Sequence, residues 1–109
     1  MIRPARGPVA PGSYRYGDRM QIVRRHLLVS GQVQGVSYRD SCRRVAEAHD
    51  VTGWVRNVGK GQVEAVFEGD VAAVDAVAEW AHQGPDHAVV SDVKVREEKP
   101  QGLEDFRIR

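Results

Sequence analysis

The chain has 109 residues, of which 41% are hydrophobic and 28% are charged, with a formal net charge of +1 and a single cysteine. These values are typical of one soluble globular domain, and they exclude a disulfide framework. No apolar run approaches the roughly 18 residues that a membrane-spanning helix needs. Residues 1–19 lack the apolar stretch of a secretory signal, so we expect a cytoplasmic location.

The near-zero net charge hides an uneven distribution. Residues 1–25 hold six Arg and one Asp, whereas residues 26–109 hold ten Lys or Arg and fourteen Asp or Glu. The Pro-rich and Gly-rich segment at 1–19 buries too little apolar surface to fold, so we expect a disordered basic extension there and a folded domain at 20–109. A basic tail can attract nucleic acid or anionic lipid by charge alone. Its Arg residues form neither an amphipathic face nor a dense cluster, which favours a solvated leader.

The hydrophobic pattern of the domain predicts two helices and five strands. Two β-α-β halves, joined by a hairpin at Gly59-Lys60-Gly61, indicate an α+β, ferredoxin-like βαββαβ sandwich. We expect two helices on one face of a four- to five-stranded antiparallel sheet. In chain order the prediction is a strand at 24–31, a helix at 39–49, strands at 52–58 and 62–68, a helix between its N-cap Asp70 and Gly84, and strands at 89–96 and 106–109.

The segment between the first strand and the first helix reads Gly-Gln-Val-Gln-Gly-Val-Ser-Tyr-Arg, from Gly31 to Arg39. A glycine-bearing turn that enters a helix presents unpaired backbone N–H groups at the positive end of the helix dipole. Arg39 falls in the first turn, where that dipole disfavours a cation, so an anionic ligand would explain its presence. Asn57, at the end of the second strand, is a second candidate, although it can equally begin the hairpin turn.

Several other kinds of site lack support. No Gly-x-Gly-x-x-Gly or P-loop motif is present, and the histidines lie scattered without ligand spacing, so we expect no dinucleotide, triphosphate or metal site. Ser37 has no base nearby in the sequence. Glu64, Glu68 and Asp70 are interpreted as a solvated strand face and a helix cap rather than as an acid-base pair.

Single-strand RNA readers share this topology and place aromatic side chains on the third strand within a basic surface. Here that strand carries two acids and one aromatic residue, so nucleic-acid binding is not expected. Trp54 and Phe67 are accordingly predicted to be core residues. The helical spacing also places Cys42 in the core rather than at a reactive position.

Three stretches together resemble acylphosphatases. They are the segment from Gly31 to Arg39, Gly-Trp-Val-Arg-Asn from Gly53, and Val-Glu-Ala-Val-Phe-Glu-Gly ending at Gly69. The resemblance extends from Arg24 to Arg109. It implies an enzyme of ferredoxin-like fold that hydrolyses the carboxyl-phosphate bond of acylphosphates, without a metal or an organic cofactor.

The resemblance also implies roles for particular residues. Arg39 and Asn57 correspond to the catalytic pair, with Arg39 binding the phosphoryl group and Asn57 positioning the attacking water. The expected ligands are a small acylphosphate and phosphate, and we expect a monomer without membrane or nucleic-acid partners. The backbone N–H groups expected to cradle the phosphate belong to Gln32, Val33, Gln34, Gly35, Val36, Ser37 and Tyr38.

The chain departs from the acylphosphatase pattern at two positions. Tyr38 replaces the usual Phe, and Val58 replaces a hydroxyl residue that many members carry.

Three alternative functions remain open. A binding module could hold acylphosphates in the same loop without hydrolysing them. A domain like the acylphosphatase-like part of hydrogenase-maturation carbamoyltransferases could act on carbamoyl phosphate, although those proteins are large. A nucleic-acid adaptor could act through the basic tail, with steeply salt-dependent binding.

Overall fold

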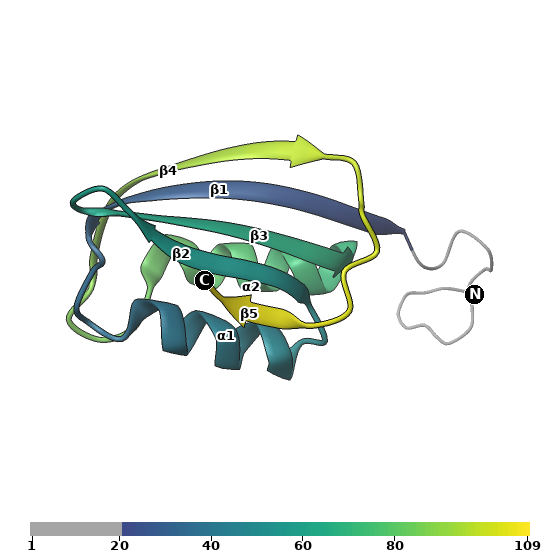
Figure 1. Ribbon diagram of the computed structural model, residues 1–109, viewed down its shortest axis with the longest axis horizontal. Helices are drawn as coiled ribbons and strands as arrows, with labels where there is room; N and C mark the ends of the chain where they lie inside the picture. The colour runs from purple at the N-terminus through teal and green to yellow at the C-terminus, as the bar shows by residue number, and fades with distance from the viewer. Residues whose placement is uncertain (1–20) are drawn as a thin grey trace, which may run out of the picture.

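The computed structural model describes residues 21–109, which form two helices and five strands (Figure 1). The predicted extension at 1–19 lies outside the described residues, and the domain boundary near Met20 stays a prediction. Within 21–109, neither helix has the length and apolar character needed to cross a membrane. The elements are β1 (Ile22–Gln32), α1 (Tyr38–Ala48), β2 (Thr52–Val58), β3 (Gln62–Asp70), α2 (Val71–Gln83), β4 (Val89–Glu98) and β5 (Phe106–Ile108).

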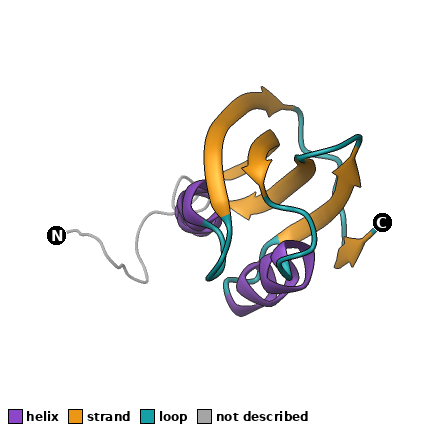
Figure 2. Ribbon diagram, turned by 90° about the vertical axis from the view of Figure 1, so that its left-hand side faces the viewer, coloured by secondary structure: helices purple, strands orange, loops and turns teal. Residues whose placement is uncertain are grey.

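The five strands form one sheet in the order β4-β1-β3-β2-β5, and both helices cover the same face of it (Figure 2). Strand β3 is antiparallel to both β1 and β2, and β1 is antiparallel to β4. The expected ferredoxin-like α+β sandwich is confirmed.

The fifth strand makes the sheet mixed rather than wholly antiparallel, because β5 runs parallel to β2. Strand β4 ends where β1 and β2 begin. The chain from 99 to 105 therefore crosses that end of the sheet, and β5 must start beside the start of β2 (Figure 1). Hydrogen bonds from Gly53 N to Asp105 O at 2.9 Å and from Arg109 N to Val55 O at 2.9 Å fix this pairing.

The core lies between the sheet and the helices. Cys42 is fully buried on α1, as predicted, and burial raises the pKa of its thiol. Phe67 is also fully buried, and its ring lies 6.1 Å from that of Phe106. The buried helical residues are Tyr38, Cys42 and Ala46 on α1, and Val74, Val77, Ala78 and Ala81 on α2.

The opposite face of the sheet corrects two predictions. Trp54 is not a core residue, because it alternates with the buried Gly53 and Val55 and points away from the helices. Arg109 lies over its ring, 4.4 Å from the ring centre. Glu68 is not solvated, since only 3% of it is exposed. Asp70 does occupy the N-cap position of α2, but its side chain forms no capping hydrogen bond.

Candidate functional site

The turn at 33–37 joins the end of β1 to the start of α1. Val33 is buried and anchors the turn, whereas Gly35 and Ser37 are exposed and have positive φ values of 77° and 63°. Within residues 21–109, the backbone N–H groups of 34–38 have no protein acceptor. Gln32 still belongs to β1 and pairs with Val89, so the exposed part of the predicted cradle starts after it.

Gln34 fixes this turn against the hairpin between β2 and β3. Its side-chain amide donates to the carbonyl of Gln62 at 2.8 Å and to that of Gly59 at 3.1 Å. A further bond joins Gly31 N to Gly61 O at 3.0 Å. The phosphate-loop candidate is therefore tied to the end of β2, the strand that carries Asn57.

Arg39 is the second residue of α1 and is half-buried. It lines a pocket of about 180 Å³. Across the described part of the chain, no carboxylate pairs with Arg39, and its neighbour Asp40 pairs instead with Arg43 and Arg44. Among residues 21–109, the Arg39 guanidinium therefore has no anionic partner, and its role in binding phosphate stays a prediction. The pocket is lined by Val33, Gly35, Ser37, Tyr38, Arg39, Asp40 and Ile108.

Asn57 is exposed and lies at the same end of the sheet as the turn. Strands β1 and β2 are both antiparallel to β3, so their C-terminal ends lie together, beside the start of α1. Asn57 is in register with the fully buried Val63, which places it on the helix-covered side of the sheet. It does not line the Arg39 pocket itself. The fold therefore places Asn57 next to the pocket and the turn, not inside the pocket.

Tyr38 begins α1, and its side chain points into the core. Its hydroxyl donates a 2.7 Å hydrogen bond to Ala81 O on α2, and its ring lies 5.3 Å from that of Trp80. Burial raises the pKa of Tyr38, so the phenol remains a donor. The hydroxyl that departs from the family pattern is therefore satisfied inside the core and stays out of the Arg39 pocket.

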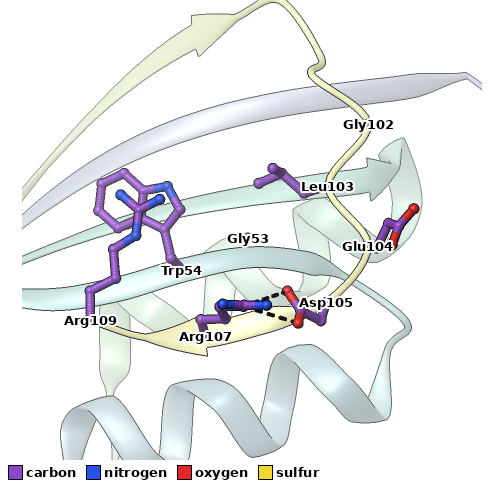
Figure 3. Close-up of a pocket in the computed structure, with 8 residues that line it drawn as sticks. All are labelled: Gly53, Trp54, Gly102, Leu103, Glu104, Asp105, Arg107 and Arg109. Atoms are coloured by element: carbon purple, nitrogen blue, oxygen red, sulfur yellow. Dashed lines mark hydrogen bonds and ion pairs between the residues drawn. The ribbon is translucent and has the colours of Figure 1, made fainter.

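A larger hollow of about 400 Å³ lies on the other side of β5 and contains no predicted site residue (Figure 3). Trp54 and Arg109 stack at its edge, and Arg107 forms two bonds to the carboxylate of Asp105, at 3.1 and 3.0 Å. The positive charge of Arg107 is therefore directed at the neighbouring Asp105 carboxylate and not into the hollow. In residues 21–109, no group of three His, Cys, Asp or Glu could hold a metal ion.

The sequence did not predict Ile108 as a site residue. It lines the Arg39 pocket because β5 pairs with β2. A strand of only three residues after a polar connection gave no signal for its partner or direction. The one available signal was an apolar side chain two residues after Phe106, on the same face of a strand.

Comparison with known proteins shows the family and the fold of the chain. The sequence model of the acylphosphatase family matches residues 25–108. An acylphosphatase of Haloquadratum walsbyi is 54% identical over 86 residues, which cover 79% of this chain and 92% of the relative. The structure of an acylphosphatase from Coxiella burnetii is 39% identical with a TM-score of 0.79, over 84% of this chain and 96% of that one.

A larger protein contains a similar domain. Full-length HypF in its phosphate- and nucleotide-bound form matches with a TM-score of 0.77 and 27% identity, over 86% of this chain but only 12% of that one. The acylphosphatases, in contrast, match over nearly their whole length. The chain belongs to the acylphosphatase family and is an enzyme that hydrolyses acylphosphates.

Proposed function

We propose that this chain hydrolyses its acylphosphate in the Arg39 pocket, using the backbone N–H groups of 34–38 as a cradle for the phosphoryl oxygens and Asn57 to position the attacking water. The observation that carries the proposal is the Arg39 guanidinium. It stands at the positive end of α1, without a carboxylate partner among residues 21–109, in the same pocket as Gly35 and Ser37. A phosphoryl group would supply the missing negative charge.

The cradle consists of backbone N–H groups. Gly35 and Ser37 adopt positive φ values, a conformation that lets successive N–H groups converge on an anion. Gln34 holds the turn in place through the hairpin carbonyls, so the donors are arranged before the substrate arrives. Arg39 adds a planar fork that binds two phosphate oxygens at once.

The reaction needs little acid-base chemistry. Water attacks phosphorus, the bond between phosphorus and the acyl oxygen breaks, and the electron pair leaves with a carboxylate that is stable at neutral pH. Phosphoryl transfer depends mainly on positioning and on stabilisation of charge. The Asn57 amide orients the water but cannot take its proton near neutral pH, so that proton passes to a phosphate oxygen of the substrate. The proposed mechanism uses no metal and no organic cofactor.

The pocket also bounds the substrate. Its volume of about 180 Å³ is below the roughly 300 Å³ at which pockets for drug-sized ligands begin. This favours an acylphosphate that is smaller than a drug-sized ligand.

The proposal extends to a monomer that works in the cytoplasm. Arg39, Asn57 and the turn all come from one chain, and Cys42 is a buried free thiol. Size-exclusion chromatography with light scattering should give a mass near 12.1 kDa. A stable dimer whose dissociation abolishes turnover would contradict the monomer.

The direct test is hydrolysis of acetyl phosphate by the purified chain in metal-free buffer, with and without a chelator. We expect turnover that the chelator leaves unchanged. Tight binding of acetyl phosphate without turnover would favour a binding module instead. Turnover that disappears with the chelator and returns with added metal would contradict the cofactor-free mechanism.

A further inference from the structure

Ile108 is an apolar side chain that lies, partly exposed, in the wall of a charged pocket. It is 37% exposed and lines the same pocket as Arg39 and Ser37. A cradle for phosphate needs N–H groups and a cation, and an isoleucine supplies neither. An isoleucine at this position is suited to contact a part of the ligand other than the phosphoryl group.

The position of Ile108 is fixed by the pairing of β5 with β2. Ile108 is in register with Val55, and the next residue, Arg109, donates its backbone N–H to Val55 O at 2.9 Å. Phe106, two residues earlier, is buried against Phe67. Alternation along the strand therefore turns Ile108 toward α1, on the same side of the sheet as Val55.

Asn57 and Ile108 differ in their position relative to the Arg39 pocket. Asn57 lies two residues beyond Val55 on β2, roughly 6–7 Å further along the strand, and outside the Arg39 pocket. Ile108 and Arg39 lie within the pocket. Asn57 and Ile108 are therefore separated along the strand direction, with Ile108 in the same pocket as Arg39 and Asn57 outside it. In-line displacement requires the leaving group to lie opposite the water.

We propose that Ile108 contacts the acyl group of the substrate and sets a preference for acylphosphates with an apolar acyl group. The inference rests on the proposed function and adds the substrate class to it. Val33 and Tyr38 line the same pocket and are almost fully buried, at 1% and 2% exposed, so Ile108 offers the more accessible apolar surface. An aryl or branched acyl group gains from this contact, whereas an acetyl group is too small to use it fully.

The test compares benzoyl phosphate with acetyl phosphate as substrates of Ile108→Ala. One methylene in an apolar pocket is worth about tenfold or more in kcat/KM, so the ratio of kcat/KM for benzoyl phosphate over acetyl phosphate should fall about tenfold. Val95→Ala is the matched control, because Val95 is a 49% exposed apolar residue on the far edge strand β4. This control should leave the ratio unchanged.

Two further variants keep the test decisive if Ile108→Ala loses stability. Ile108→Leu keeps an apolar side chain and should retain the ratio within about twofold, whereas Ile108→Gln has a similar size and should lose it. Equal losses for both substrates, or an unchanged ratio in a folded Ile108→Gln variant, would overturn the role of Ile108 while leaving the proposed function intact. A wild-type chain that hydrolyses neither substrate would overturn both.

Discussion

Glu68 and Arg24 form a buried ion pair on the face of the sheet that the helices leave open, with 3.4 Å between Glu68 Oε2 and Arg24 Nη1. The two residues are only 3% and 6% exposed. Glu68 also accepts the backbone N–H groups of Gln101, Gly102 and Leu103, at 2.8, 2.7 and 2.8 Å. One carboxylate therefore holds the connection that carries the chain to β5.

Glu68→Gln should lower the free energy of unfolding by roughly 2–4 kcal/mol. The NH2 group of the glutamine would face backbone N–H groups that need an acceptor, and the buried Arg24 would lose a negatively charged partner. Glu47→Gln, on the exposed face of α1, is the control and should change the free energy of unfolding by less than about 0.5 kcal/mol. Urea unfolding at pH 7 measures both variants.

The Glu68→Gln variant also tests how the stability of the fold depends on pH. Burial acts to raise the pKa of Glu68, but the backbone N–H groups and Arg24 outweigh it and hold the pKa below its ordinary value. A carboxylate with a depressed pKa in the folded state contributes fully above the unfolded value of about 4.3, and this contribution is lost as the pH falls through the folded pKa. Wild-type stability should therefore drop more steeply than that of Glu68→Gln below about pH 4.3. Parallel stability curves for the two proteins would count against this role of Glu68.

Tyr38→Phe tests the hydrogen bond between α1 and α2. Removing the hydroxyl leaves the carbonyl of Ala81 without this donor, which should cost about 1–2 kcal/mol. For a domain of this size, that corresponds to a fall in Tm of roughly 4–16 °C. Differential scanning calorimetry measures it, and an unchanged or higher Tm would show that the bond contributes no net stability.

Gly35→Ala and Gly102→Ala form a matched pair. Both glycines have positive φ values, 77° and 75°, and an added Cβ would meet no atom within 4 Å at either position. Each substitution should therefore cost about 1–2 kcal/mol of stability through backbone strain alone. Only Gly35 belongs to the phosphate cradle. Inhibition by inorganic phosphate should weaken in Gly35→Ala and not in Gly102→Ala, whereas equal weakening would argue against the cradle.

Arg39→Lys tests whether the guanidinium acts as a fork or only as a charge. A lysine ammonium keeps the charge but cannot bind two phosphate oxygens in the same plane. We expect kcat/KM to fall by at least about 100-fold in Arg39→Lys, the scale on which the loss of one preorganised donor acts, and further in Arg39→Ala. Steady-state assays with acetyl phosphate measure this. A lysine variant with nearly full activity would reduce Arg39 to a point charge.

The features that the sequence predicts well are local ones. The boundaries of β2, the glycine hairpin and the burial of Cys42 follow from alternation, turn residues and helical spacing. Arg39 can be recognised from the sequence because its positive charge lies in the first turn of a predicted helix, at the positive end of the helix dipole. Each of these signals lies within a few residues of the feature that it predicts.

The features that the sequence misses depend on distant partners. Glu68 looks solvated by alternation, but its partners include Arg24 and the backbone at 101–103, which the fold brings from both ends of the described chain. Trp54 is predicted to be a core residue because the strands offer no base-stacking platform, yet its position in the pleat turns it to the open face. Ile108 reaches the Arg39 pocket only because β5 pairs in parallel with β2.

Arg39 and Asn57 have separate proposed roles in catalysis, and the Asn57→Ala variant distinguishes them. The measurement is kcat for acetyl phosphate together with the inhibition constant of inorganic phosphate, on a variant shown to be folded by circular dichroism. Because Asn57 positions the water and Arg39 holds the phosphoryl group, kcat should fall by about 100-fold or more while the inhibition constant changes by less than about threefold. A folded Asn57→Ala variant with full turnover, or one in which phosphate affinity falls as much as turnover, would show that Asn57 does not position the water while Arg39 holds the phosphoryl group.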